Sequence, residues 1–454
     1  MQERSAHRQT GAATLLVTII VLMVMTLITF FANRNILFET KTAANQYRSA
    51  KAIEAAEAGL EWAIANLNHM QKIGADCLAS TAATDRVMRD KYLDPDGNGN
   101  YSPTDPPVSG VPTCPQPVEP PYGDTAYESA RYVRDGPACT LVSGAWQCSC
   151  PAAGSLPTLA SCTDPQGCPT FRLRFQNVVN CSLASPKVED PGLVRITSLG
   201  CNDSQVPCVP GTAGRADASV EVTQVIKLLN GLATVPAAAL TAKGNVDFGS
   251  NAITATNRDP GTNGITINAG GAITGFIGES TIQTLPGTPP AGSLVGGDTS
   301  LSSLNDDQMF ISFFGSTKEA FKSSSATTVI NCSGVCNEQV LAAIGAGARQ
   351  IWIEGDTELN SNATFGSPTN PVMLSVNGNL TVRGTITIYG VVYCQDGVWD
   401  NTGGGTAQII GAAIAEGSFT ATGTPHPTYD PDVLANLRST NGEFAKVPGG
   451  WRDF

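Results

Sequence analysis

The sequence predicts an α+β chain whose C-terminal part is all-β. Three observations support this fold class: a long N-terminal segment with helical composition, cysteines concentrated between residues 77 and 208, and short apolar runs separated by glycine after about residue 237. The 454 residues include 47 glycines and 29 prolines, which favour loops and short strands over further long helices. We expect a helix over 12–70, a cysteine-rich α+β domain over 71–236, and a β-domain over 237–454.

The first element is an apolar helix long enough to cross a membrane. Residues 12–32, AATLLVTIIVLMVMTLITFFA, carry no charge, and they lie between Arg8 and Arg34. As a helix they span about 32 Å. A secretory signal peptide has a shorter apolar region of about 7 to 15 residues, followed by a cleavage site between small residues. The sequence therefore predicts a transmembrane helix that is retained in the protein.

The same helix is expected to continue to about Met70. The segment after Asn33 has no proline, and Gly59 is its one weak helix former. The whole helix would be about 88 Å long. Apolar residues recur in its second half at steps of three and four, which predicts one buried face. The residues predicted to form that face are Ile53, Ala56, Leu60, Ile64 and Leu67.

Residues 8–63 resemble the N-terminal domain of PilX-type minor pilins. The shared features are a short basic leader that ends in glycine, a run of small apolar residues, an Arg-Asn pair after the membrane helix, and the sequence AAEAGLE. The resemblance implies that residues 1–11 form a class III leader peptide and that a prepilin peptidase cuts between Gly11 and Ala12. It also implies a pilin-like fold for the cysteine-rich domain. From the residue pattern alone, a single-pass anchor with a helical stalk is the alternative.

Leu16 departs from the pattern of major pilins. The resemblance places a glutamate at the fifth residue of a mature major pilin, where it pairs with the N-terminal amine of a neighbouring subunit. Here that residue is Leu16, so the buried partner for such an amine is missing. Tip pseudopilins of type II secretion systems and PilX-like proteins share this lack. We therefore expect an initiator or tip subunit rather than a repeating shaft subunit.

The cysteines predict disulfides in an oxidising compartment. The chain has 13 cysteines and only three histidines, and it contains no CxxCH sequence, so disulfides are favoured over zinc or haem. Ten cysteines between residues 77 and 208 have no readable connectivity. Cys332 and Cys336 lie apart from the others and flank a Ser-Gly-Val turn, which predicts that they pair. Cys394 lies in an apolar run and is the expected free, buried thiol.

A segment in the cysteine-rich domain matches the spacing of a calcium-binding loop. In DPDGNGNYSPTD, residues 94–105, carboxylate and amide side chains alternate, and a glycine occupies the position where the loop turns sharply. The expected Ca²⁺ ligands are Asp94, Asp96, Asn98, Asn100, Ser102 and Asp105. Pro103 and the prolines after Asp105 exclude the second helix of an EF-hand. A solvated polar turn is the alternative, because DG and NG are turn dipeptides.

The C-terminal domain predicts a parallel β-helix-like fold. Its apolar runs recur at intervals of roughly 14 to 21 residues, the range in which strands of successive turns stack. A β-sandwich is the competing fold. A helical insertion is expected at about 300–323, where apolar residues follow helical spacing and would cover the end of the coil. Trp451 is expected to anchor the C-terminus against the coil.

The composition excludes several classes of function. A net charge of −12 with no basic cluster outside the leader makes nucleic acid an unexpected partner. No GxSxG, HExxH or P-loop sequence occurs, so we expect no enzyme. The carboxylates that a glycan-cleaving β-helix would use show no matched pair in their spacing. They are Glu354, Asp356, Asp396 and Asp400.

The function implied by the resemblance is that of a minor pilin in a type IV pilus. Such a subunit waits in the inner membrane, starts the fibre, and then lies outside the cell at the pilus tip. Its partners would be other minor pilins, the major pilin, and a PilY-type tip adhesin. A type II secretion pseudopilin is a variant of this function. The alternative of a different class is a membrane-anchored cell-surface β-helix that binds or processes glycan.

Overall fold

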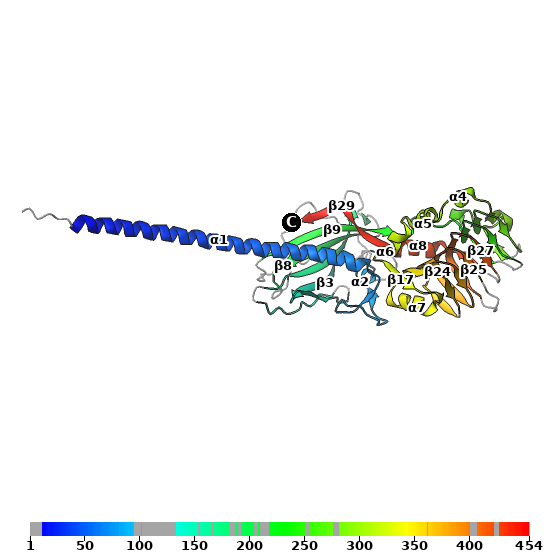
Figure 1. Cartoon of the computed structure of the whole chain (residues 1–454), viewed down its shortest axis with the longest axis horizontal. Coiled ribbons are helices and arrows are strands. Elements are labelled where there is room, and N and C mark those ends of the chain that lie inside the picture. Colours follow the sequence, from blue (N-terminus) through cyan, green and yellow to red (C-terminus); the bar gives the residue numbers. More distant parts are fainter. Residues whose placement is uncertain are drawn as a thin grey trace, which may run out of the picture.

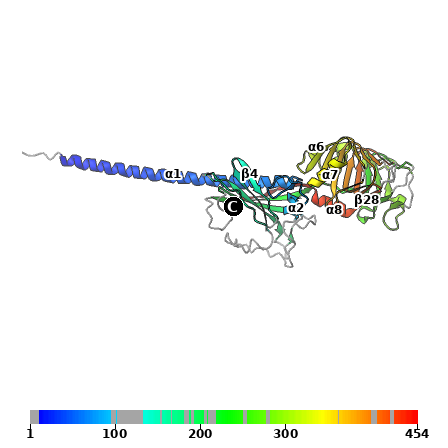
Figure 2. The same cartoon turned by 90° about the horizontal axis from the view of Figure 1, so that it is seen from below.

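The fold was analysed in a computed structural model of the whole chain. The described residues are 11–94, 101, 133–152, 155–164, 167–180, 187–188, 192–203, 208, 218–249, 254–275, 281–360, 362–399, 406–421 and 426–453. Along the long axis, a protruding helix leads into an antiparallel sheet, and a second domain of stacked strands follows (Figures 1 and 2).

Helix α1 (Gly11–Asn68) is a single element of 58 residues, as the sequence predicts to within two residues at its C-terminal end. The described side chains of its apolar N-terminal half are exposed, and its C-terminal half lies on the antiparallel sheet (Figure 1). At 1.5 Å per residue the helix is about 87 Å long. It therefore connects a membrane-length apolar segment rigidly to the folded part of the protein.

The antiparallel sheet has six strands in the order β29-β9-β8-β5-β3-β4. Alternation along β5 sends Phe171, Leu173 and Phe175 to the core beneath α1, and the residues between them to the opposite face. The C-terminal half of α1 thus packs on one face of the sheet, as the resemblance implies. The strands are β3 (Val133–Val142), β4 (Ala145–Ser149), β5 (Thr170–Asn177), β8 (Leu193–Cys201), β9 (Ser219–Asn230) and β29 (Gly442–Asp453).

Small residues bring α1 unusually close to strand β8. Ala52 and Ala56 are fully buried, and a Cβ on Gly200 would lie 2.1 Å from the Ala52 carbonyl oxygen and 2.4 Å from the Ala56 nitrogen. A Cβ on Gly59 would likewise lie 2.3 Å from Ser198 Oγ. The small residues of AAEAGLE thus allow the helix backbone to contact the sheet.

The predicted buried face of α1 is partly wrong. Ala56, Leu60 and Leu67 are buried, but Ile53 is 41% exposed, and Ile64 is half-buried. The close approach to β8 leaves room for alanine and glycine at the contact and turns the larger Ile53 away from it. The buried stripe therefore passes through Ala52 and Ala63 instead of Ile53.

The last strand of the chain completes the first sheet. β29 pairs antiparallel with β9, from Gly442 opposite Asn230 to Asp453 opposite Val222. The predicted domain limits place residues 442–453 in the C-terminal domain, whereas they lie in the antiparallel sheet of the first domain. Trp451, predicted to contact the coil, is 48% exposed on this strand. The C-terminal domain is thus inserted between two neighbouring strands of the first domain.

Smaller elements surround the first sheet. Hairpin β1–β2 and helix α2 follow α1 directly, and β6 and β7 form a separate antiparallel pair. Their limits are β1 (Lys72–Ile73), β2 (Arg86–Val87), α2 (Met88–Tyr92), β6 (Val179–Asn180) and β7 (Lys187–Val188).

Two parallel sheets form the C-terminal domain among the described residues. The larger has twelve strands and the smaller seven. The larger contains β10 (Leu240–Ala242), β12 (Ala255–Thr256), β13 (Ile267–Ala269), β15 (Ile282–Gln283), β16 (Leu294–Val295), β17 (Thr327–Asn331), β19 (Gln350–Glu354), β21 (Ala363–Phe365), β22 (Val372–Asn377), β24 (Ile386–Cys394), β26 (Gln408–Ala415) and β28 (His426–Tyr429). The smaller contains β11 (Val246–Asp247), β14 (Ile273–Thr274), β18 (Gly334–Val335), β20 (Thr357–Leu359), β23 (Leu380–Val382), β25 (Gly397–Trp399) and β27 (Phe419–Ala421).

The first turns of this domain stack on its last turns. β10 lies between β13 and β26, so the chain enters in the middle of the stack and winds outward through β13 and β16. The chain then returns to the other end of the stack at β17 and continues through β19, β22 and β24 to β26. β26 pairs with β10, which joins the two halves of the stack. Every strand pair described in the two sheets is parallel. This pairing does not fit the antiparallel sheets of the β-sandwich alternative.

Helices cover the outer face of the larger sheet. Phe310, Phe314 and Phe321 pack on Trp352 and Tyr393, in the hydrophobic cluster that also holds α8. The sequence places helices over about 300–323 and expects them to cover the end of the coil, whereas they lie along its side. The covering helices are α4 (Thr299–Ser302), α5 (Asp306–Phe314), α6 (Lys318–Ser323) and α8 (Pro431–Thr440). Helix α7 (Asn337–Ala346) instead packs through Val340 on the core between the two parallel sheets. Two 3-10 turns lie at Pro260–Thr262 and Pro290–Ser293.

Glycine and a short polar residue recur where the chain turns from the larger sheet into the smaller one. The side-chain oxygen of Asp356 accepts from the Asn379 backbone N–H at 2.9 Å, and that of Asp396 accepts from Ser418 N–H at 2.6 Å. A Cβ on Gly378 would lie 2.7 Å from the carbonyl carbon of Gly355 in the turn below. Each corner thus satisfies a backbone donor of the next corner and needs glycine for the close approach.

Candidate functional site

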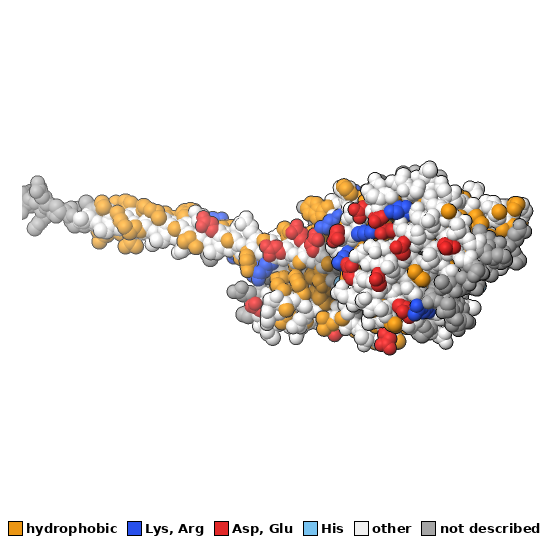
Figure 3. All heavy atoms as spheres, turned by 45° about the vertical axis from the view of Figure 1, so that its right-hand side comes forward, with side chains coloured by type: hydrophobic (Ala, Val, Ile, Leu, Met, Phe, Trp, Pro, Cys, Tyr) orange, Lys and Arg blue, Asp and Glu red, His pale blue; other side chains and the backbone are white. Residues whose placement is uncertain are grey.

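The exposed half of α1 carries most of the exposed large apolar side chains among the described residues. Hydrophobic side chains gather along it (Figure 3), and the large ones described from Leu15 to Phe31, with Ile36 and Phe38, are 46–67% exposed. By length and composition this is a helix that can cross a membrane. An exposed apolar patch of this size marks a surface that contacts lipid or another protein.

The polar groups within this segment are satisfied inside the helix. The hydroxyl groups of Thr18, Thr26 and Thr29 each donate to carbonyl oxygens three and four residues earlier, at 2.9–3.1 Å. Each of these hydroxyl groups therefore has a hydrogen-bond acceptor within the helix, which matters because a lipid core supplies none. The threonines therefore allow the helix to lie in lipid or against another apolar helix.

The residues predicted for processing and fibre packing lie at the start of α1. Gly11 is the first residue of the helix, followed by Ala12, and Leu16 projects outward with 60% of its surface exposed. The first carboxylate after Gly11 is Glu39. Arg34 lies over the ring of Phe38 at 5.7 Å, where the uncharged segment ends. No acidic group in residues 12–38 can therefore pair with an amine.

A buried arginine fastens the C-terminal end of α1 to the rest of the chain. The Arg89 side chain donates through Nε to the Leu67 carbonyl at 2.8 Å, and through Nη1 to the carbonyls of Gly442 at 3.0 Å and Thr440 at 3.4 Å. Leu67 and Thr440 lie in the last turns of α1 and α8, where helix dipoles favour a cation. Burial lowers the pKa of Arg89, which is fully buried.

A second arginine joins the two domains beside Arg89. Arg349, which directly precedes β19, donates to Asp90 Oδ2 at 2.5 Å and to the Tyr101 hydroxyl at 3.2 Å. The Tyr101 hydroxyl donates to the Thr440 carbonyl at 3.0 Å. Burial raises the pKa of Tyr101 to about 12. Because these groups come from α2, the C-terminal domain and the end of α8, the network holds the two domains in one orientation.

The start of β29 is also bonded to the end of α1. The Asn68 amide group donates through Nδ2 to the Phe444 carbonyl at 3.0 Å and accepts through Oδ1 from the Phe444 N–H at 2.7 Å. The side chain of Asn68, the last residue of the helix, thus makes the two backbone hydrogen bonds with Phe444 that a neighbouring strand would otherwise make. The N-terminal helix and the C-terminal strand are one packed unit.

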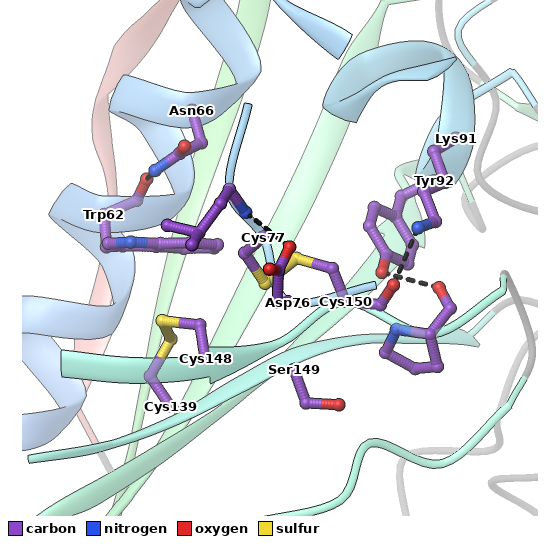
Figure 4. Close-up of a disulfide and its surroundings, with 12 residues drawn as sticks. Trp62, Asn66, Asp76, Cys77, Lys91, Tyr92, Cys139, Cys148, Ser149 and Cys150 are labelled. Atoms are coloured by element: carbon purple, nitrogen blue, oxygen red, sulfur yellow. Dashed lines mark hydrogen bonds between the residues drawn. A yellow bond between two sulfur atoms is a disulfide. The ribbon is translucent and has the colours of Figure 1, made fainter. Parts of the chain in front are cut away.

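Disulfides cross-link the first domain, as the composition predicts. Cys77–Cys150 and Cys139–Cys148 lie close together near the end of β4 (Figure 4), and Cys162–Cys168 and Cys201–Cys208 close short loops. Lys91 and Tyr92 of α2 donate to the carbonyls of Cys150 and Pro151 at 2.7 and 2.8 Å. The edge of the sheet is thereby fixed to α2.

The isolated cysteines of the second domain also follow the sequence prediction. Cys332 is bonded to Cys336, and Cys394 is a free, buried thiol. Burial raises the pKa of Cys394 to about 12, so the thiol stays protonated and unreactive.

The predicted calcium loop lies largely outside the described residues. Asp94 is described and buried, and its carbonyl accepts from Arg86 at 2.8 Å. The other predicted ligands, Asp96, Asn98, Asn100, Ser102 and Asp105, are not among the described residues. Within the described part of the chain, no group of three or more His, Cys, Asp or Glu side chains could hold a metal ion.

Three of the four acidic residues singled out in the second domain accept hydrogen bonds from a helix or from the corners of the chain. Glu354 accepts from Lys322, from Trp352 Nε1 at 2.9 Å and from Asn377 at 2.8 Å. Burial raises the pKa of Glu354, but these bonds lower it to about 2 overall. Asp356 and Asp396 accept from backbone N–H groups at the corners. Asp400 lies outside the described residues.

Sequence reasoning missed the two arginines of the interdomain network. Arg89 follows the apolar pair Val87-Met88 in a short helix, and Arg349 precedes the apolar run IWI, so both would be expected at a solvated edge. The signal that could have found them is the polar residue directly beside an apolar run. The recurring Gly-Asx pair in EGD, NGN and KGN could similarly have located the corners of the second domain.

The comparisons with known proteins agree with the resemblance in the N-terminal segment. Residues 10–61 match the family model described as PilX N-terminal. No curated protein matches this sequence. The crystal structure of the competence-associated pilin ComZ from Thermus thermophilus aligns with 90% of this chain and 97% of its own chain, at 11% sequence identity. The TM-score of 0.20 is too low for this alignment to indicate a shared fold. In the segment that forms most of α1, the chain is therefore similar to the N-terminal domain of minor pilins of the PilX type.

Proposed function

We propose that this chain is a minor pilin that starts a type IV pilus and then lies at its tip. The observation that carries the proposal is α1, whose first 28 residues contain no carboxylate and present Leu16 where the resemblance places a glutamate in major pilins. A subunit without this carboxylate cannot pair with the amine of a neighbouring subunit. It is therefore suited to begin a fibre rather than to repeat within it.

The partners proposed for α1 are a membrane first and other pilins later. The uncharged segment with internally bonded threonines suits the hydrocarbon core of an inner membrane, and afterwards the apolar bundle of a fibre. Other minor pilins and the major pilin would pack on this surface, and a prepilin peptidase would remove the leader. A structural role, rather than catalysis, is supported by the satisfied carboxylates of the second domain.

The second domain is proposed to be a parallel β-helix that presents a binding surface away from the fibre. The observation behind this is the register of its strands, in which Thr327, Gln350 and Met373 stack at equal intervals of sequence. The Arg349–Asp90 contact holds this domain at the far end of the molecule from the apolar helix (Figure 1). A partner there, such as a PilY-type adhesin, would be reached without disturbing α1.

Replacing Gly11 with leucine should block processing and leave the protein in the membrane. A bulky side chain at the residue before the cut would prevent the peptidase from placing the backbone for cleavage. Intact mass and N-terminal sequencing of protein from sheared fibres and from membranes would measure this. The wild-type chain should begin at Ala12 in fibres, and Gly11→Leu should begin at Met1 and be absent from fibres.

A control variant, Gln9→Ala, should be processed like the wild type because its side chain is not next to the cut. A wild-type chain that begins at Met1 and occurs only in membranes would overturn the pilin function. Glycan turnover by that chain would then favour the anchored β-helix. Recovery of a processed chain only in cells that make a type II secretion fibre would assign the pseudopilin variant.

We also propose that the loop over 94–105 binds calcium. Its support is the spacing of the sequence and the burial of Asp94 at its start. Calcium at 100 times its Kd would stabilise the folded chain by about 2.7 kcal/mol, so a chelator should lower the thermal unfolding midpoint. The double variant Asp96→Asn/Asp105→Asn should lose this response, while Asp307→Asn on α5 should keep it. An unchanged midpoint in chelator would exclude the site.

A further inference from the structure

Both connections between the two domains lie on neighbouring strands of the antiparallel sheet. The chain leaves this sheet at the end of β9 and returns at the start of β29, where Asn230 and Gly442 lie opposite each other. Both strands run roughly lengthwise in the molecule beside α1, and both connections lie at the end of the sheet that faces the second domain (Figures 1 and 2). Tension between α1 and the second domain would therefore pull β9 and β29 together, along their own axes.

The ladder that resists such a pull joins β9 to β8. It has nine residue pairs, from Leu193 opposite Lys227 to Cys201 opposite Ser219, and its register does not shift. β8 has no direct connection to the second domain, and its other edge pairs with β5 over eight residue pairs, again without a shift. Because the pull acts along the strands, the hydrogen bonds of the β8–β9 ladder are loaded side by side and must break together.

The irregular pairings of this sheet lie elsewhere. One register shift falls between Lys446 and Trp451, where β29 pairs with β9, and the other falls between Asp135 and Ala138, where β3 pairs with β5. A bulge leaves residues out of the ladder and weakens it locally. β29 and β9 are pulled in the same direction, so the ladder between them is not sheared. The ladders on both edges of β8, which a lengthwise pull would load, are the regular ones.

Helix α1 packs directly on the strands that would carry the tension. Its buried side chains share one hydrophobic cluster with Val194 of β8 and with Val222 and Ile226 of β9. At the end of the helix, Asn68 makes two hydrogen bonds with Phe444 of β29. A pull on either connecting strand therefore passes into the helix over much of its packed length.

We propose that the β8–β9 ladder is a mechanical clamp that transmits tension from the second domain to α1. Once a pull opens the Arg349–Asp90 ion pair between the domains, the strands carry the tension, and their register makes them shear rather than peel. The rate of forced unfolding is set by the barrier to this first step. The source of the tension, a partner held at the far end of the molecule, rests on the proposed minor-pilin function, whereas the clamp can be tested without a pilus.

The test is single-molecule force spectroscopy of the full-length chain in detergent. One handle is attached at Lys41, on the exposed part of α1, and the second at either Leu229 or Ser219, which are exposed at opposite ends of β9. Azide-bearing residues at these positions would carry the handles, so that the disulfides stay intact. The second domain lies outside the chain between the handles in both molecules.

The two attachments load the same ladder in different ways. The α1 backbone at Ala52 lies beside Gly200, which is opposite Val220, so Lys41 lies beyond the end of β9 that holds Ser219. A pull away from Lys41 shears the ladder when it acts on Leu229, and it peels the ladder open pair by pair when it acts on Ser219. At equal pulling speed, the first unfolding step should need several times more force for Leu229 than for Ser219.

Equal forces in the two molecules, the result if α1 leaves the sheet before the ladder opens, would overturn the proposal. Both molecules should unfold at the same urea concentration as the wild type, because the replaced side chains are exposed, so a difference in force reports the direction of the pull. Failure of processing at Gly11 would count against the minor-pilin function and leave these forces unchanged. The two proposals can therefore fail separately.

Discussion

Replacing Gly200 with valine should destabilise the first domain by about 3 kcal/mol or more. The new Cβ would lie 2.1 Å from the Ala52 carbonyl oxygen and 2.4 Å from the Ala56 nitrogen. Both are backbone atoms of α1, so no side-chain rotation can relieve the contact, and the helix would have to leave the sheet. Urea unfolding of the full chain in detergent, followed by tryptophan fluorescence, would measure the loss.

Gly345→Val provides the matched control. Gly345 lies in α7, and a Cβ there would meet nothing within 4 Å. Valine is a better helix former than glycine, so this variant should match the wild type to within about 0.5 kcal/mol. If Gly200→Val unfolded at the same urea concentration as the control, the close contact between α1 and β8 would be contradicted.

Replacing Arg89 with methionine should cost about 3–5 kcal/mol. Methionine fills similar space but leaves the buried carbonyls of Leu67, Thr440 and Gly442 without the donor they share. Loss of the positive charge would also remove its favourable interaction with the C-terminal ends of the α1 and α8 dipoles. Urea unfolding would report the loss, and limited proteolysis should cut near residue 441 sooner than in the wild type.

Two further variants separate charge from geometry. Arg89→Lys keeps the charge but cannot reach three carbonyls with one ammonium group, so its stability should lie between wild type and Arg89→Met. Arg383→Met removes an exposed arginine that contacts Glu358 at 3.4 Å and should change stability by less than about 1 kcal/mol. An Arg89→Met protein as stable as Arg383→Met would show that this network does not join the domains.

Local patterns predicted the elements of this chain better than their connections. The uncharged run from Ala12 to Ala32 identified the membrane-length helix because composition alone determines transfer into lipid. The apolar runs of the second domain are buried on both faces, as in VMLSV at β22, so they could be recognised as strands. Their parallel pairing depends on contacts between residues about twenty apart, which no short window contains.

Other features could not be predicted because they depend on distant backbone. Helical periodicity predicts that Ile53 lies on the buried face of α1. Gly200, far along the chain, brings the helix so close to β8 that the smaller Ala52 is buried there instead. β29 alternates weakly and contains Pro448, so nothing local places it beside β9.

The position of β29 also sets the order in which the chain can fold. β9 cannot pair on its outer edge until residues 442–453 have been made, and Arg89 cannot complete its bonds before Thr440 and Gly442 arrive. During synthesis the outer edge of β9 in the antiparallel sheet therefore stays unpaired until the whole second domain has been made. A chain that stops a dozen residues early would keep that edge exposed, and such edges invite aggregation. Pairing of the outer edge of β9 thus depends on a strand made after the whole second domain.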